Sequence, residues 1–162
     1  MSVTRGNVGE HLAMAELLYR GFDAYWADRR NPKFDIACFW NASDRATRLR
    51  VKTTSNHSAI WSVKSNGLFL EMQAKNDYVM IVNLGQGLRE RDIYIVPTTR
   101  LAEDIDRDHN HYTSVLKTDG TQRKQDQKMR CIRFVGKDKP SDHSWGYQDK
   151  YAQFREAWDQ LK

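Results

Sequence analysis

Residues 34–55, FDIACFWNASDRATRLRVKTTS, decide the fold of this chain of 162 amino acids. The segment Phe34–Trp40 is rich in aromatic and apolar residues, as strands are, and the polar cluster Asn41–Asp44 is typical of a turn. A second run with strand character, RLRVKTTS, follows at residues 48–55. The stretch therefore predicts two strands joined by a turn.

The charged side chains of this stretch follow a pattern that a purely hydrophobic hairpin would not need. Side chains alternate across a strand, so Arg48, Arg50 and Lys52 share one face of the second strand. Asp35 stands at the start of the first strand. We expect this acid to face the basic row on the neighbouring strand.

A helix is predicted before these strands, at Gly6–Arg20. Its apolar residues recur at helical spacing, and Gly21 follows as a helix-ending glycine would. Two roles are open for Glu10. With Asn7 as the N-cap, Glu10 could close a capping box on the cap amide. Alternatively, Glu10 points from the helix toward Asp35.

Two later segments are predicted to be interior strands of a sheet. Residues 78–84, YVMIVNL, are almost continuously apolar, which indicates a strand buried on both faces. Residues 92–96, DIYIV, form a similar run that ends at a proline. A short helix is expected next, and then a polar loop at residues 106–119.

The length of the chain indicates one domain with a substantial core. We predict an α/β or α+β fold in which helices flank a central mixed β-sheet, as a single domain over residues 1–162. Its core is expected at about 5–105, with a basic hairpin or loop at about 117–139. A C-terminal helix is predicted at about 147–161, where aromatic residues recur at helical spacing.

Positive charge is concentrated in one part of the chain. The net charge is +5, and residues 117–139 alone contain eight Lys or Arg against three Asp. This segment is either a solvated loop or edge hairpin, or an arm that contacts phosphates, since clustered positive charge is expected of nucleic-acid binding. The candidate nucleic-acid-binding residues are Arg48, Arg50, Arg123, Lys124, Lys128 and Arg130.

The composition favours a cytoplasmic protein with no membrane partner. No apolar run approaches the roughly 20 residues of a membrane span, and the N-terminal residues lack the apolar core of a secretory signal. Cys38 and Cys131 are far apart and have no metal-ligand spacing. We expect Cys38 to be a buried thiol, which suits a reducing compartment.

Several short motifs occur in an order and spacing shared with a known group of nucleases. They are Gly6-x-x-Gly9-Glu10-x-x-Ala13, Phe34-Asp35-Ile36, Arg50-Val51-Lys52-Thr53, Asp77-Tyr78-Val79 and Tyr94-Ile95-Val96-Pro97. Together they resemble the PD-(D/E)xK nuclease superfamily, over about the first 100 residues of the chain. The resemblance implies a restriction-endonuclease-like fold.

The resemblance also implies metal-dependent hydrolysis of phosphodiester bonds, with nucleic acid, DNA in the first place, as the partner and Mg²⁺ or Mn²⁺ as the cofactor. In family terms Asp35 bridges the metals, and Glu10 adds an outer ligand or holds a water. The backbone carbonyl of Val51 completes the ligand shell, and Lys52 orients the attacking water. The implied catalytic residues are Asp35, Lys52 and Glu10, and the implied metal ligands are Asp35, Glu10 and Val51.

Arg50 departs from the family pattern, because relatives carry an acid or sometimes Gln at this position. A guanidinium has no acceptor atom and keeps its charge, so it cannot bind a metal ion. Arg50 could pair with an acid such as Asp44, or a migrated acid such as Glu71 could supply the missing oxygen. In the third case the chain has kept the fold and lost hydrolysis.

Two functions are therefore open. The first is a metal-dependent endonuclease with a degenerate or rearranged site. The second is a catalytically inactive module with the nuclease fold, which binds nucleic acid or an acidic protein partner. The sequence leaves the oligomeric state open, with a homodimer as one option.

Overall fold

Five strands form the main sheet, in the order β1-β2-β3-β5-β6. They span Asp23–Trp26 (β1), Ile36–Phe39 (β2), Thr47–Thr54 (β3), Asp77–Asn83 (β5) and Asp92–Pro97 (β6). β3 and β5 are parallel, and the other neighbours are antiparallel. This computed structural model describes residues 3–28, 33–55, 58–62, 69, 71–85, 91–123, 129–133 and 151–162. The predicted mixed sheet is confirmed.

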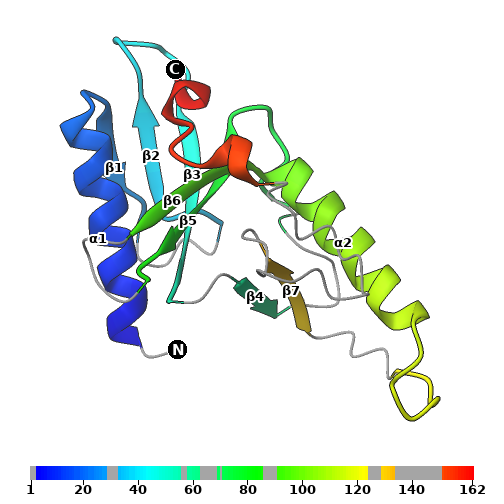
Figure 1. The fold of residues 1–162 in the computed structure, drawn as a ribbon. Coiled ribbons are helices and arrows are strands. Elements are labelled where there is room, and N and C mark those ends of the chain that lie inside the picture. The colour runs from blue at the N-terminus through cyan, green and yellow to red at the C-terminus, as the bar shows by residue number, and fades with distance from the viewer. Residues whose placement is uncertain are drawn as a thin grey trace.

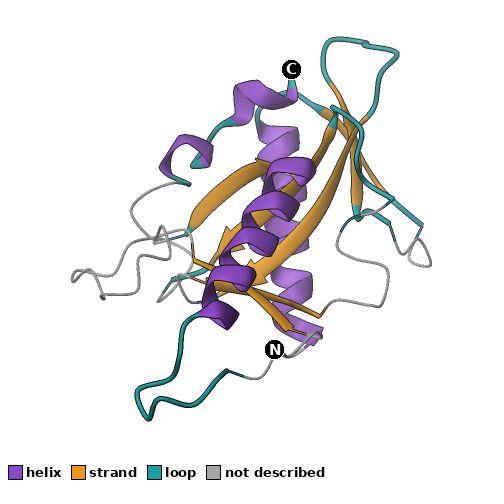
Figure 2. Ribbon diagram, turned by 90° about the vertical axis from the view of Figure 1, so that its right-hand side faces the viewer, coloured by secondary structure: helices purple, strands orange, loops and turns teal. Residues whose placement is uncertain are grey.

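Two long helices lie on opposite faces of this sheet, α1 at Val3–Tyr19 and α2 at Thr98–Ser114 (Figures 1 and 2). One apolar core forms between α1 and the sheet, and a second forms on the α2 side. β5 contributes to both cores, because every residue from Asp77 to Asn83 is buried. The arrangement confirms a single domain with a central mixed sheet flanked by helices.

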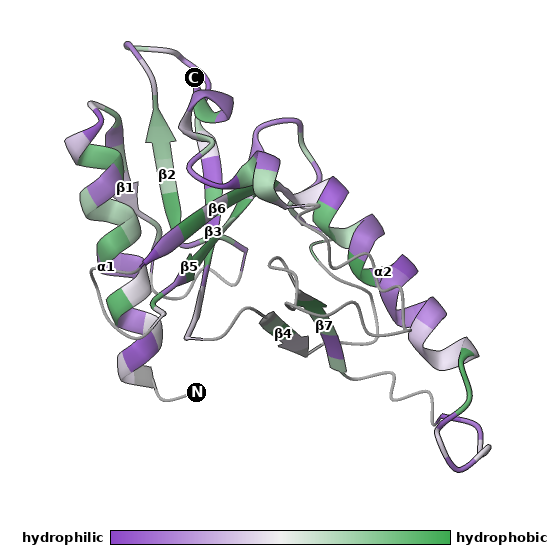
Figure 3. Cartoon of the chain, viewed as in Figure 1, coloured by the Kyte–Doolittle hydropathy of each residue, from purple (hydrophilic) through white to green (hydrophobic). Residues whose placement is uncertain are grey.

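Hydrophobic residues concentrate where these layers meet. The strands β2, β5 and β6 are mostly hydrophobic along their length, whereas α2 alternates between hydrophobic and hydrophilic residues (Figure 3). Burying apolar side chains against both faces of a sheet is the main stabilising contribution to such a fold. None of the helices in the described part of the chain is long and apolar enough to cross a membrane.

The prediction of a loop at residues 106–119 was wrong over residues 106–114, because α2 continues to Ser114. The buried side of α2 includes two acids, Asp104 and Asp108, beside Leu101 and Ile105. Asp104 accepts hydrogen bonds from Arg100 and from the buried Tyr151. Acids on a buried helix face hide the apolar periodicity that a sequence pattern relies on.

The segment predicted as a basic hairpin or loop at about 117–139 is described at residues 117–123 and 129–133. Met129–Arg133 forms β7, which pairs with β4 at Ser58–Ser62 to make a separate two-stranded sheet. Lys117 and Thr121 close a local turn, in which the Lys117 N–H donates to the Thr121 carbonyl at 2.9 Å. Residues 124–128 and 134–139 lie outside the described part.

The predicted C-terminal helix does not form over residues 151–162. Two short 3₁₀ helices, η2 at Ala152–Phe154 and η3 at Trp158–Leu161, replace it. Between them the Glu156 N–H donates to the Ile93 carbonyl at 2.8 Å, so the segment covers the outer edge of β6. Hydrogen bonding to a sheet edge takes the place of continuous helical bonding. Residues 147–150 lie outside the described part.

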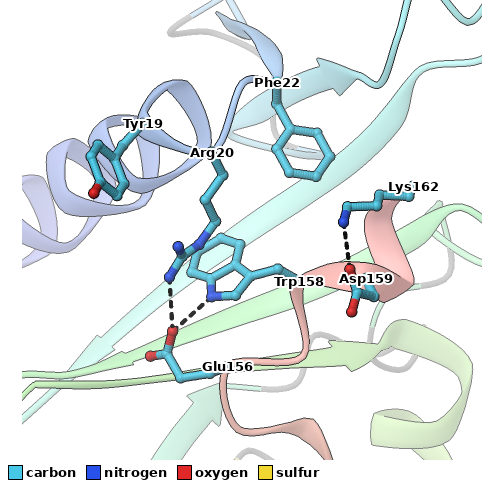
Figure 4. A pocket seen from close by; sticks show the side chains of 7 residues that line it. All are labelled: Tyr19, Arg20, Phe22, Glu156, Trp158, Asp159 and Lys162. Atoms are coloured by element: carbon cyan, nitrogen blue, oxygen red, sulfur yellow. Dashed lines mark hydrogen bonds and ion pairs between the residues drawn. The ribbon is translucent and has the colours of Figure 1, made fainter.

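The C-terminal segment also packs against the end of α1, where seven side chains line an open groove (Figure 4). The Arg20 guanidinium lies 4.3 Å from the centre of the Trp158 ring and 3.2 Å from Glu156. Lys162 pairs with Asp159 at 2.5 Å. These cations are paired with acids of the same groove, which points to an anchor for the C-terminal segment.

Candidate active site

Asp35 lies directly before β2 and is held against β3 by two hydrogen bonds. Its N–H donates to the Leu49 carbonyl at 2.8 Å, and its Oδ2 accepts from the Val51 N–H at 2.7 Å. The two bonds enclose Arg50 on either side along the β3 backbone. The expected placement of Asp35 and Lys52 on adjacent antiparallel strands is confirmed by the pairing of Ile36 with Leu49.

Helix α1 approaches β3 so closely that only glycine fits at position 9. A Cβ there would lie 1.9 Å from Thr53 Oγ1, a side chain that is buried in the interface. Thr53 in turn donates to the Gly6 carbonyl at 3.3 Å. Contact between the helix backbone and the strand places the next residue, Glu10, beside the β2–β3 pair.

The capping role considered for Glu10 is wrong. Helix α1 begins at Val3, so Asn7 lies inside the helix and is not its N-cap. Glu10 instead lies close enough to Asp35 for the two charges to interact. Burial raises the pKa of Glu10, and the charge of Asp35 raises it further, while His11 opposes the shift.

Asp35 is subject to opposing influences. Burial raises the pKa of Asp35, whereas the hydrogen bond from Val51 and the positive charge of Arg50 lower it, and the net direction is upward. Both carboxylates are therefore harder to ionise than exposed ones. A cation placed between them would relieve this cost, which is a common property of ion-binding and catalytic carboxylates.

Lys52 lies on the other side of β3 from the Gly9 contact. Burial lowers the pKa of Lys52, and the nearby charge of Arg50 lowers it further. The Lys52 ammonium lies 5.5 Å from the centre of the Trp61 ring of β4. Trp61 is the register partner of Arg130 on β7, so the small sheet connects the basic row of β3 with Arg130.

The structure gives Arg48 a position in the sheet. Its guanidinium makes two hydrogen bonds to the Asp77 carboxylate, at 2.7 and 2.6 Å, across the parallel β3–β5 pair. The Asp77 side chain is 0% exposed. This bidentate pair neutralises a buried acid, and the sequence contained no signal for it because the partners are 29 residues apart.

Arg123 and Arg130 make local contacts. The Arg123 guanidinium lies 4.3 Å from the centre of the Tyr112 ring, and its Nε donates to the Val115 carbonyl at 3.1 Å. Arg130 lies 3.7 Å from Asp106 of α2. Lys124 and Lys128 lie outside the described residues.

The donor chemistry of Glu10 and Asp35 fits Mg²⁺ or Mn²⁺. Mg²⁺ is commonly held by one or two carboxylates, with water and substrate phosphate completing its shell. Glu71, considered as a migrated acid, is exposed and lies 3.8 Å from Lys33. Among the described residues, no group of three or more His, Cys, Asp or Glu is arranged to hold a metal ion.

Four residues that join α1 to β1 and to the end of β3 were not singled out from the sequence. Arg5 on α1 donates to Ser55 Oγ, just after β3, at 3.5 Å. His11 follows Glu10 and contacts the ring of Trp26 on β1, with 5.3 Å between ring centres. None belongs to a spaced motif, so only the approach of α1 to β1 and β3 could reveal them.

The fold is similar to that of a known nuclease. The structure of the bacterial homing endonuclease I-Ssp6803I matches 99% of this chain and 91% of its own, with a TM-score of 0.55 and 13% sequence identity. Comparison with protein-family models and with characterised proteins gave no match. Since likeness at this identity shows the fold alone, the chain has a nuclease-like fold.

Proposed function

We propose that this protein is a nuclease of the PD-(D/E)xK type, which hydrolyses phosphodiester bonds of DNA with Mg²⁺ or Mn²⁺. The observation that carries the proposal is the position of Glu10. A helix and a strand far apart in sequence bring Glu10 beside Asp35, and each carboxyl has a raised pKa. Lys52 follows two residues after Arg50 on the same strand.

Glu10 and Asp35 would hold the metal ion through carboxylate oxygens, with the Val51 carbonyl as a further ligand. A bound ion supplies activation of water and neutralisation of charge that develops on the phosphate. The Val51 N–H keeps the Asp35 carboxylate against β3, so the ligand is oriented before any substrate arrives. Gly9 lets α1 pack closely against β3, and Glu10 is the next residue on that helix.

Lys52 and Arg50 would act on the phosphate and the attacking water. The Lys52 ammonium can donate to a water or a phosphate oxygen, and its half-buried position limits the directions it can take. Arg50 is exposed beside Asp35 and offers several N–H donors to an approaching phosphate. In this role Arg50 would neutralise negative charge on the substrate phosphate and would not be a ligand of the metal ion.

A second candidate function is favoured by the position of Arg50. Its charge lowers the pKa of Asp35 and so already compensates part of the carboxylate charge. In that case the chain is an inactive nuclease-fold module that binds nucleic acid, or an acidic protein partner, through its basic groups. We propose DNA as the primary partner in both cases, and a homodimer as the assembly to test by sedimentation.

Cleavage of plasmid DNA with and without Mg²⁺ or Mn²⁺ separates the two functions. A nuclease cuts only with metal, and Glu10→Gln and Asp35→Asn should each reduce cutting by at least about a hundredfold, the order of one catalytic group. Glu103→Gln is the matched control, because Glu103 is an exposed acid on α2. Binding of DNA without metal-dependent cutting would support the inactive module.

A further inference from the structure

Half-exposed aromatic side chains lie on β1, the edge strand of the main sheet. Trp26 is 47% exposed and Tyr25 is 60% exposed, on opposite faces of the strand. A large ring left in solvent costs free energy that a protein normally avoids by burial. Trp26 is the one that the fold places near the candidate active site.

The backbone places Trp26 at the edge of the site. Trp26 pairs with Ile36, and the next residue, Ala27, donates its N–H to the carbonyl of Asp35 at 2.9 Å. The Trp26 ring contacts His11 edge-on, with 5.3 Å between ring centres, and His11 directly follows Glu10. The indole thus belongs to the residue before the backbone contact with Asp35, and the imidazole it touches belongs to the residue after Glu10.

The surroundings of Trp26 are polar, which argues against a continuous apolar patch for a protein partner. On the neighbouring surface α1 presents Asn7, Glu10 and His11, and β1 is flanked by Asp28. Arg50 adds positive charge beside Asp35, and Arg5 lies further along α1, against Ser55 after the end of β3. Proteins bind unpaired nucleotides by combining an aromatic ring, on which a base stacks, with cations that follow the phosphates along the strand.

We propose that Trp26, supported by His11, is a stacking site for an unpaired nucleobase next to the phosphate that is cut. The inference rests on the proposed nuclease function and narrows its substrate to single-stranded DNA or DNA with locally unpaired bases. A base within an intact duplex is stacked on its neighbours and cannot present its face to Trp26. Trp26 is thus a substrate-binding residue, and His11 positions it.

The test measures binding without metal, so that it does not depend on hydrolysis. A labelled single-stranded oligonucleotide and its blunt duplex are titrated with wild type, Trp26→Ala and Trp26→Phe in EDTA, at several salt concentrations, by fluorescence anisotropy. Tyr25→Ala is the matched control, because it removes a ring that is also exposed, from the opposite face of β1. Thermal melting confirms that each variant is folded.

We expect Trp26→Ala to weaken single-strand binding by roughly 5- to 100-fold, as loss of one stacked base does. Trp26→Phe should retain most of the affinity, and Tyr25→Ala should bind like wild type. The salt dependence of Trp26→Ala should match that of wild type, since stacking releases no counterions. Duplex binding should change by less than about twofold.

Several results would overturn the inference. One is an unchanged affinity of Trp26→Ala for the single strand, and another is an equal loss of affinity for the single strand and the duplex. A third is a wild-type dimer in sedimentation that becomes a monomer in Trp26→Ala. The last result would make β1 a self-association edge. Absence of binding to either oligonucleotide would overturn both the stacking site and the proposed function. Trp26-dependent binding without metal-dependent cutting would contradict hydrolysis alone.

Discussion

Arg50 stands beside Asp35, so a metal ion at this carboxylate would meet a positive charge at close range. Two unit charges about 4 Å apart interact by roughly 4 kcal/mol at an effective dielectric constant near 20. Arg50 is exposed, and water and salt reduce this interaction. The residue nevertheless has the right position and sign to weaken metal binding.

Replacement of Arg50 by Glu should therefore strengthen metal binding. We expect Arg50→Glu to raise the affinity for Mn²⁺ by at least about tenfold after screening, because repulsion becomes attraction. Arg50→Ala should give a smaller gain, and Asp35→Ala should remove binding. Calorimetric titration with Mn²⁺ measures all three, with nuclease assays alongside. Equal affinities in wild type and Arg50→Glu would show that Arg50 does not control the metal.

The raised pKa values of Glu10 and Asp35 make a prediction about stability and pH. Their ordinary values are 4.5 and 3.8, and burial raises both. Such groups favour the folded state below their unfolded pKa, and this contribution is lost as the pH rises through the raised folded pKa. At pH 7, Glu10→Gln and Asp35→Asn should melt above wild type, with a gap that shrinks toward about pH 4.

Calorimetric melts from pH 4 to pH 8 test this sign. Glu103→Gln, on the exposed side of α2, should show no comparable gain. Saturating Mn²⁺ should raise the melting temperature of wild type and leave both amide variants unchanged, because they lack a carboxylate ligand. Lower melting temperatures for both variants at pH 7 would contradict the prediction. They would mean that neighbouring groups already stabilise the charged carboxylates in the folded protein.

At the scale of elements, the contact of α1 with β3 depends on Gly9. A Cβ at position 9 would lie 1.9 Å from Thr53 Oγ1 and 2.8 Å from Thr53 Cβ. We expect Gly9→Ala to lower the free energy of unfolding by about 1–3 kcal/mol, as overpacking does. The displaced helix would carry Glu10 away from Asp35, so metal affinity should fall as well.

Gly6 offers a matched control on the same helix, because a Cβ there would have nothing within 4 Å. Gly6→Ala should be neutral or stabilise by up to about 1 kcal/mol through helix propensity. Adding Thr53→Ala to Gly9→Ala should recover part of the loss, which a double-mutant cycle in urea measures. Equal effects of the two glycine substitutions would refute the close contact.

The β3–β5 pair depends on Arg48 in the same way. Arg48→Ala would leave the buried Asp77 carboxylate without its cation, and we expect a loss of about 3–5 kcal/mol in unfolding free energy. Arg50→Ala, two residues along the same face, should change it by less than about 1 kcal/mol because Arg50 is exposed. Urea denaturation distinguishes this structural role from an effect on DNA binding alone, in which both variants would be equally stable.

At the scale of the whole molecule, the net charge of +5 permits the proposed DNA binding, and we expect that binding to weaken as salt rises. Alanine at Arg123, Lys124 and Lys128 together should weaken binding to all sequences alike. The slope of log affinity against log salt should fall by up to about three, one for each lost phosphate contact. An unchanged slope would exclude this segment from the interface, and absence of binding at low salt would exclude nucleic acid as the partner.

Sequence pattern alone predicted four strands of the main sheet, β2, β3, β5 and β6, and suggested Glu10, Asp35 and Lys52 as site residues. The apolar run at 78–84 identifies β5. The acid at Asp35 and the alternating basic row that follows it identify β2 and β3. Both patterns can be read from consecutive residues, because burial and side-chain alternation follow the order of the chain. The motif Gly6-x-x-Gly9-Glu10-x-x-Ala13 placed Glu10 on the first helix. These features depend on local spacing, which a sequence displays directly.

Only the tertiary structure decided which distant groups meet. The pairing of Arg48 with Asp77, the pairing of β4 with β7, and the C-terminal segment on the edge of β6 all join residues far apart in the chain. Helix α2 extends past its expected end to Ser114, and its buried Asp104 is paired with Arg100, Arg107 and Tyr151. Partners of this kind are selected by packing and charge in three dimensions, which no local period encodes.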